Sequence, residues 1–258
     1  MRSYLISWSP PTTWRRWLLF TIGIVIAVGS WEFIGSAELL GTRMPSISSI
    51  LIGFLDPRIS AVIARSIAVT VPQAGIAFVF GVLAGVLGAL LQLLVPATRR
   101  SAHRFASLLN AVPAIILSPI LVSIFGVQQV PVVVGTLGVF FSVFVTTSSG
   151  FLNVPAGALD YVRTLGSSPW ARFRHVEGPA ALPYFADGLR LAGPSAILGT
   201  MFGEWFGSSN GLGVLVQVAW QNFQVDLLWA AALTATALAI SAIAIFGFIS
   251  KLLGRRFS

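Results

Sequence analysis

Apolar residues along the chain gather into six long runs, separated by polar stretches that hold nearly all of the charges. A helix needs about 20 apolar residues to cross the hydrocarbon core of a bilayer. The pattern therefore predicts an all-α polytopic membrane protein with about six transmembrane helices, in a single transmembrane domain spanning residues 1–258. The predicted spans are Trp17–Gly35, Val69–Val95, Phe105–Phe125, Val130–Gly150, Leu189–Phe206 and Leu227–Ile249.

The first span has a second interpretation as a signal peptide. Arg15 and Arg16 precede it, and Gly35-Ser36-Ala37 resembles a small-residue cleavage site. However, its apolar run is longer than the about 7–15 residues of a signal core, and Trp31 and Glu32 are poor neighbours for cleavage. We therefore expect an uncleaved first helix.

The basic residues predict the orientation of the chain. With the N-terminus inside, all but three of the 16 Lys and Arg residues fall in cytoplasmic segments, and the exceptions are Arg43, Arg58 and Arg65. This positive-inside asymmetry places both termini in the cytoplasm, with tails at 1–16 and 251–258 and a long cytoplasmic loop at 151–188. The net charge of +8 then reflects topology, and no nucleic-acid partner is expected.

Composition excludes several kinds of chemistry. With no cysteine in the chain, disulfides and thiolate metal sites are excluded. The single lysine, Lys251, is followed by leucine, so no phosphate-binding loop of the G-x-x-x-x-G-K-[ST] type is present. His103 and His175 lie far apart in sequence, which disfavours zinc catalysis and a catalytic triad. We expect no enzyme activity, metal or cofactor in this chain.

The predicted spans also lack ionisable groups near the bilayer midplane, which coupled carriers usually have. Glu32 and Glu204 both fall towards the outer ends of their helices. This pattern therefore favours a transport pathway whose energy source lies in another protein. The helix centres offer neutral polar groups, namely Gln92, Asn110, Thr146, Thr147, Ser148, Ser149 and Thr200. Gly81, Gly85 and Gly88 form a small-residue face that favours packing within the chain over a contact with another copy.

The 151–188 segment contains the clearest local signals. A short helix is predicted over Ala156–Leu165, ended by Gly166. Ser168 stands at an N-cap position before Pro169, and a two-turn helix is predicted from Pro169 to Glu177, ended by Gly178-Pro179.

Trp170, Phe173 and Val176 recur three residues apart and predict an apolar stripe, with Arg172, Arg174 and Glu177 facing elsewhere. One interpretation is an amphipathic helix on the membrane surface, in contact with lipid. The other is a docking element that fills a groove on a cytoplasmic partner. A helix this short is marginal alone in water, so either partner would be needed to hold it.

Three motifs follow one another in order along residues 65–250. The first is Pro113-Ala-Ile-Ile-Leu-Ser-Pro119, followed by Phe125-Gly126. The second is the loop with Asp160, Gly166, Trp170, Phe173, Val176, Pro179 and Ala181-Leu-Pro183. The third is Glu204-Trp-Phe-Gly-Ser-Ser-Asn-Gly-Leu-Gly213. Together these motifs resemble binding-protein-dependent ABC transporter permeases, in the branch of nitrate, taurine and aliphatic sulfonate importers. The loop departs from the pattern of that family at Asp160, Val162 and Glu177-Gly178, which suggests a second permease that differs from this chain.

The resemblance implies a type I ABC importer permease in the bacterial inner membrane. It implies two ATP-binding cassette subunits, a second permease chain in a homodimer or heterodimer, and an extracytoplasmic solute-binding protein. ATP would be bound by the partner subunit. The resemblance also implies that the ATPase-coupling residues are Asp160, Arg163, Gly166, Trp170, Arg172, Phe173, Val176 and Pro179.

For the translocation pathway, the candidates are the polar groups of the helix centres and the residues of the matching motifs, namely Asn110, Pro113, Pro119, Thr146, Thr200 and Glu204. The branch implies a solute that is a small organic or inorganic anion or a pyrimidine vitamin precursor. The alternative class is a stand-alone secondary carrier or channel without an ATPase partner. Co-purification with a P-loop protein distinguishes the two.

Overall fold

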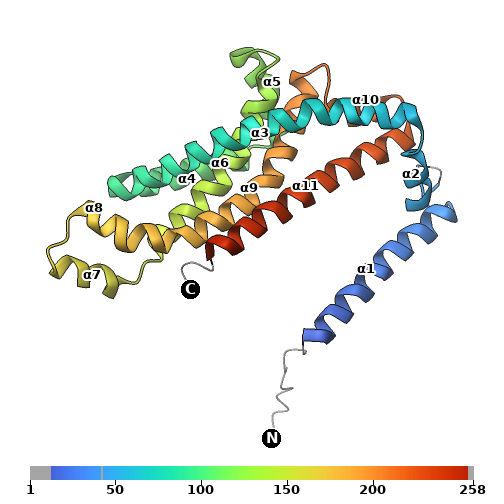
Figure 1. Cartoon of the computed structure of the whole chain (residues 1–258). Helices are drawn as coiled ribbons and strands as arrows, with labels where there is room; N and C mark the ends of the chain where they lie inside the picture. The colour runs from blue at the N-terminus through green and yellow to red at the C-terminus, as the bar shows by residue number, and fades with distance from the viewer. Residues whose placement is uncertain (1–12, 42, 255–258) are drawn as a thin grey trace, which may run out of the picture. The chain divides into compact units, whose positions relative to one another are not determined.

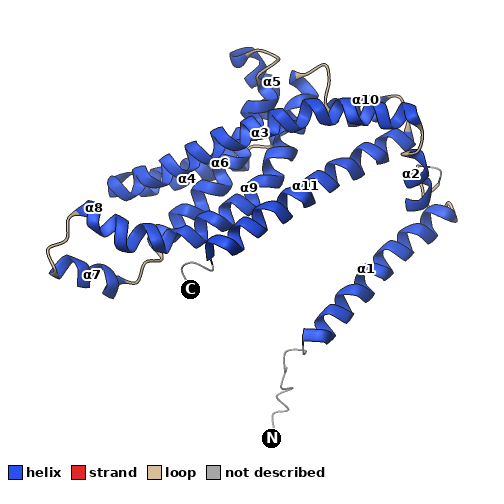
Figure 2. Ribbon diagram, viewed as in Figure 1, coloured by secondary structure: helices blue, strands red, loops and turns tan. Residues whose placement is uncertain are grey.

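The computed structural model describes residues 13–41 and 43–254. Within these ranges every regular element is helical, as Figure 2 shows. The predicted terminal tails are covered only in part: residues 1–12 and 255–258, with Arg2, Arg255 and Arg256, lie outside the described residues.

Most of the described elements are helices of 7 to 38 residues, joined by short turns (Figure 1). A helix satisfies its backbone hydrogen bonds internally, which suits a chain whose surroundings offer no water. In chain order the elements are α1 (Thr13–Ser36), α2 (Ile47–Gly53), α3 (Pro57–Leu94), η1 (Pro96–Thr98), α4 (Arg99–Ala111), α5 (Ala114–Phe125), α6 (Val130–Leu152), α7 (Ala156–Thr164), α8 (Pro169–Arg172), η2 (Phe173–Glu177), α9 (Gly178–Gly207), α10 (Leu212–Gln221) and α11 (Val225–Gly254).

The chain divides into two compact units, with the boundary after Pro57. In the first unit, the end of α1 is tied to the start of α2. Glu32 accepts hydrogen bonds from the backbone N–H of Ser48, at 3.1 Å, and from its hydroxyl. The Trp31 indole donates to the Pro45 carbonyl at 3.1 Å. Gly35 permits this approach, since a Cβ there would lie 2.6 Å from Cα of Ser46.

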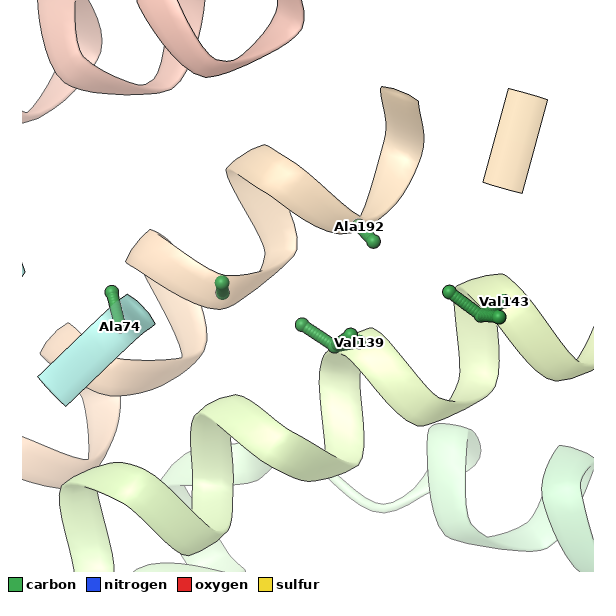
Figure 3. Close-up of a cluster of buried hydrophobic side chains, with 5 residues drawn as sticks. Ala74, Val139, Val143 and Ala192 are labelled. Atoms are coloured by element: carbon green, nitrogen blue, oxygen red, sulfur yellow. The ribbon is translucent and has the colours of Figure 1, made fainter. Parts of the chain in front are cut away.

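In the second unit, α9 is the central element, because α6, α11, α5 and α10 all pack on it. Small side chains let these helices approach closely. Close packing of this kind drives helix association in membranes, because lipid tails are as apolar as the side chains and burial alone gains little. Figure 3 shows the central cluster, in which Ala74 of α3, Val139 and Val143 of α6 and Ala192 of α9 gather. Ala196 completes this buried group.

Among the described helices, four are long and apolar enough to cross a membrane, and a bent pair of helices would make five. The four are Trp17–Ser36, Pro57–Leu94, Val130–Leu152 and Val225–Leu252. They confirm four of the predicted spans, with ends that differ by up to 12 residues. The predicted fifth span, Leu189–Phe206, is the later part of α9. At 30 residues α9 is about 45 Å long, although its polar residues keep it outside the apolar set.

The predicted third span, Phe105–Phe125, is not a single helix, and it is counted as a span only if the bent pair of helices crosses together. This stretch forms two helices, within α4 and α5, that meet at an angle of 106°. Val112 is extended, with φ −79° and ψ 121°, and Pro113 follows it. A proline ring disfavours helical geometry in the residue before it and removes a backbone donor, so the helix ends here.

The glycine face on α3 packs within the chain, as predicted. A Cβ on Gly81 would overlap the Val139 side chain of α6, and a Cβ on Gly85 would lie 2.9 Å from Cβ of Val143. A Cβ on Gly88 would meet the Phe144 ring at 3.0 Å. Hydrogen bonds from Thr136 to the Ala77 carbonyl and from Gln92 to Ser148 join the same two helices.

Replacing Gly203 with alanine should destabilise the protein. A Cβ at this position would lie 2.5 Å from Cα of Pro131, so α6 and α9 would have to separate. Overpacking of this kind costs about 1–3 kcal/mol. Thermal unfolding of the purified protein in detergent measures the loss. The matched control is Gly75→Ala on α3, where no atom lies within 4 Å of the added Cβ. An equal effect of the two substitutions would contradict the glycine contact.

Candidate functional site

The 151–188 segment begins with a helix that ends in a tight glycine turn. After α7, Gly166 has a φ of +71°, and its N–H donates to the Arg163 carbonyl at 2.9 Å. The Ser167 N–H donates to the Val162 carbonyl at 3.2 Å. These two hydrogen bonds form a Schellman motif, in which the left-handed position favours glycine. The predicted helix and its end at Gly166 are confirmed.

The next helix begins at the predicted cap. Ser168 is extended, and its hydroxyl accepts a hydrogen bond from the Ala171 N–H at 3.2 Å. Pro169 occupies the first helical turn, where a missing N–H costs nothing. The turn between α7 and α8 is therefore fixed by hydrogen bonds on both sides of Ser167.

The predicted end of this helix at Gly178-Pro179 was wrong. The chain passes from α8 through a π-helical turn, η2, directly into α9. The Gly178 N–H donates to the carbonyl of Phe173, five residues earlier. Pro179 then falls in the first turn of α9, where its missing N–H is tolerated. The first eleven residues of α9 thus belong to the segment predicted as a loop at 151–188.

The three residues of the predicted stripe differ in exposure. Trp170 is 67% exposed, whereas Phe173 and Val176 are partly buried. The rings of Trp170 and Phe173 stack at 5.7 Å between centroids, and Phe173 also meets Phe151 at 6.3 Å. Phe173 therefore connects the turn to the end of α6, while Trp170 presents its ring to the outside.

Arg172 and Glu177 form an ion pair. The sequence predicted only that both residues face away from the apolar stripe. Nε of Arg172 lies 3.1 Å from Oε1 of Glu177. The Glu177 side chain is only 8% exposed, so the pair spans the π-helical turn in a largely dry setting. Asp160 and Arg163 also pair, at 3.4 Å, but both side chains are well exposed. Exposed pairs of this kind contribute little to stability.

Single substitutions at this pair should cost more than the double substitution. Arg172→Met leaves the Glu177 carboxylate buried without its partner, and such uncompensated charge costs about 3–5 kcal/mol. Glu177→Met together with Arg172→Met removes both charges and should recover most of that loss. A double-mutant cycle on thermal unfolding in detergent measures the coupling. Additive effects of the two substitutions would mean that the pair is not formed.

Glu204, a predicted pathway residue, is fully buried and serves as a connector in this structure. Its carboxyl group accepts hydrogen bonds from the Thr70 hydroxyl and the Gly213 N–H, both at 2.7 Å. The same Thr70 hydroxyl accepts from the Leu212 N–H at 2.8 Å. Gly211, with φ +131°, lies so close to the carboxyl group that a Cβ would overlap it. This cluster joins α3, α9 and α10.

The other predicted pathway residues do not meet in one site. Thr200 is fully buried beside Gly135, and Thr146 donates to the Ser142 carbonyl at 2.8 Å against Gly188. The remaining three, Asn110, Pro113 and Pro119, lie exposed on α4, before α5 and within α5. Sequence reasoning missed Thr70, because its partner Glu204 lies 134 residues away.

Thr70→Val should loosen the turn between α9 and α10. The valine keeps the shape but removes the donor to Glu204 and the acceptor of the Leu212 N–H, at a cost of about 2–4 kcal/mol for groups left unpaired. Thermal unfolding in detergent and limited proteolysis at residues 208–211 measure the effect. Thr236→Val is the control, because its exposed hydroxyl bonds only to the Ala232 carbonyl of its own helix. Unchanged proteolysis in Thr70→Val would contradict the connecting role.

The apolar helices that are long enough to cross a membrane define a multi-pass membrane protein. The sequence model of the family described as "Binding-protein-dependent transport system inner membrane component" matches residues 77–258. The chain therefore belongs to this family of ABC transporter permeases.

Curated relatives carry permease names. A probable ABC transporter permease protein of Haemophilus influenzae is 41% identical over 48% of this chain, and the match spans about half of that protein's length, 51%. The putative aliphatic sulfonates permease SsuC of Bacillus subtilis is 27% identical over 84% of this chain and 78% of its own. The formylaminopyrimidine permease ThiX of Halalkalibacterium halodurans is 28% identical over 75% of this chain and 77% of its own.

A solved structure shares the fold. The structure titled "Inward facing conformations of the MetNI methionine ABC transporter" matches with a TM-score of 0.63 at 18% identity. The match covers 79% of this chain and 99% of that one. The fold is thus that of a type I ABC importer permease, as the sequence predicted.

Proposed function

We propose that this chain forms one half of the translocation pathway of an ABC importer in a bacterial inner membrane, with both termini on the cytoplasmic side. It pairs with a second permease chain and receives solute from an extracytoplasmic binding protein. Two separate ATP-binding cassette subunits hydrolyse ATP, since the single lysine of this chain lies outside any phosphate-binding loop. The family membership and the curated relatives support this assembly.

The 151–188 segment is the proposed contact with the ATPase. The single observation that carries this assignment is the Trp170 ring, 67% exposed on a turn that hydrogen bonds fix on both sides. A rigid, exposed aromatic side chain is typical of an anchor in a protein interface. Behind it, Phe173 and the pair of Arg172 with Glu177 hold the anchor against the end of α6 and the start of α9.

The remaining coupling residues act around this anchor. Asp160 and Arg163 form an exposed pair on α7 that orients the turn, and Gly166 supplies its left-handed backbone. Val176 and Pro179 carry the chain into α9, so movement of the ATPase reaches a membrane helix. Closure of the ATPase pair would then shift the permease between inward- and outward-facing states, as a two-state element biased from one side.

The solute belongs to one of two classes that the relatives' names suggest. SsuC is named for aliphatic sulfonates, whereas ThiX is named for formylaminopyrimidine. The proposed solute is a small anion or a pyrimidine vitamin precursor. Among anions, a sulfonate follows the name of SsuC, and nitrate or an aromatic carboxylate follows the family resemblance of the sequence. The pathway candidates Asn110, Pro113, Pro119, Thr146, Thr200 and Glu204 bear no basic group, so anion recognition by charge would fall to other residues.

Trp170→Ala should uncouple transport from ATP hydrolysis. Loss of an interface anchor costs about 2–4 kcal/mol of binding, enough to lower affinity for the ATPase subunit by about 30-fold or more. The measurements are co-purification of the ATPase subunit and solute-stimulated ATPase activity in proteoliposomes. Gly166→Asp should act in the same direction, because its left-handed φ of +71° is strained for a side chain.

Trp220→Ala is the matched control, since this tryptophan of α10 is 69% exposed and lies outside the 151–188 segment. It should leave ATPase binding unchanged. Trp170→Ala could instead keep full stimulated ATPase activity while the 151–188 segment loses its contact with the lipid surface. In that case the segment is a membrane-surface helix. Transport by the purified chain without any ATPase subunit would establish the alternative class, a stand-alone carrier or channel.

A further inference from the structure

A cavity of about 450 Å³ lies where three separate parts of the second unit meet. Gln73 of α3 forms one wall. Val127 and Gln128, in the turn between α5 and α6, form another, and Gly207, Ser208 and Ser209 at the end of α9 close the third. Small-molecule sites usually occupy about 300–1,000 Å³, so the volume fits a solute of one or two rings.

The cavity belongs to the outer end of the pathway in the proposed topology. The turn at 126–129 and the turn at 208–211 both follow helices that run outwards in that topology. Gln73 lies near the start of the predicted second span, Val69–Val95, which is also its outer end. A solute released by an extracytoplasmic binding protein would meet these residues early.

The lining carries hydrogen-bonding groups but no charge. Its polar side chains are two amides and two hydroxyls, from Gln73, Gln128, Ser208 and Ser209. Ser208 donates to the Asn210 carbonyl at 2.6 Å, and Ser209 accepts from the Asn210 amide at 3.1 Å, so the turn has a defined shape. The nearest arginine along α3, Arg65, is eight residues before Gln73, or about 12 Å of helix rise.

The ionisable side chain next to the cavity lining is a carboxylic acid, Glu204. Glu204 precedes Gly207 by three residues on α9, about 4.5 Å of helix rise, and its partner Thr70 precedes Gln73 by three on α3. An ionised Glu204 would repel an anion in the cavity, and a protonated one would offer no attraction. Moving an anion out of water without a cation to pair with is costly, whereas amides and hydroxyls can replace the water around a neutral polar molecule.

We propose that this cavity is an outer binding site for the transported solute, and that it takes a neutral, hydrogen-bonding heterocycle rather than an anion. The proposal rests on the proposed function, because it places the site on the path from the binding protein to the membrane interior. It selects the heterocycle from the two solute classes that remain open above.

The absence of cysteine from the sequence gives a direct test, since single cysteines can be introduced without a background. The reporters are Ser209→Cys and Gln128→Cys, on two different walls of the cavity, in the full chain in proteoliposomes. Each is labelled with neutral hydroxyethyl methanethiosulfonate and with anionic sulfonatoethyl methanethiosulfonate. In both reactions the thiolate forms a disulfide with the reagent and methanesulfinate leaves. Asn222→Cys, at an exposed site after α10, is the control for intrinsic reagent reactivity.

The expected ratio of neutral to anionic labelling rates is about tenfold higher at both reporters than at Asn222→Cys, the effect of about 1.4 kcal/mol against the anion. Two ring compounds of equal size then probe occupancy. Neutral nicotinamide should slow labelling about threefold at twice its dissociation constant, by simple occupancy of the site. Anionic nicotinate should not slow it.

Equal rate ratios at the reporters and at Asn222→Cys, or protection by nicotinate, would overturn the proposal. Labelling unaffected by either compound would also overturn it, because no heterocycle would then occupy the cavity. ATPase co-purification with the same chains is measured in parallel. Loss of the charge preference with intact ATPase binding rejects the site alone, whereas failure to bind any ATPase subunit rejects the proposed function.

Discussion

The close approach of α9 to α6 is the constraint on which the rest of the second unit depends. Gly199 and Gly203 of α9 face backbone atoms of Gly135 and Pro131 at distances that leave no room for a Cβ. In a lipid environment such contacts, rather than hydrophobic burial, hold helices together. Because α9 is fixed in this way, its C-terminal end places Glu204 within hydrogen-bonding distance of Thr70, and the turn at 208–211 follows directly after it.

The same helix contains three prolines yet continues without a loop from Gly178 to Gly207. Pro179 lies in its first turn, while Pro183 and Pro194 lie inside it. Prolines are tolerated in membrane helices where neighbouring elements satisfy the freed carbonyl groups. The π-helical turn before α9 serves a related purpose, since it absorbs one extra residue where α8 joins α9.

Local signals in the sequence predicted local structure well. Gly166 and Ser168 ended and began helices as expected, because their caps involve only residues within five positions. The end expected at Gly178-Pro179 failed because the Gly178 N–H continues the hydrogen bonding to Phe173 and Pro179 falls in the first turn of α9, where its missing N–H is tolerated. Val112-Pro113 indicates a helix break within the third span, but the span was predicted from the apolar residues on both sides of it. The contact of Thr70 with Glu204 could not be predicted, because the two residues lie 134 positions apart and no local pattern around either one indicates its partner.

The elements α8, η2 and α9 follow one another without a loop. The proposed ATPase contact and one wall of the cavity therefore lie at opposite ends of one continuous helical path. From Trp170 to Gly207 the helical path is about 55 Å long. If this path pivots at the contact of Gly203 with α6, the part towards Trp170 is about 50 Å long and the part towards Gly207 about 6 Å. A tilt of about 5° then moves the Trp170 end by about 4 Å and the Gly207 end by about 0.5 Å. The glycine contact would therefore let the proposed ATPase contact move while the Gly207 wall of the cavity stays nearly fixed.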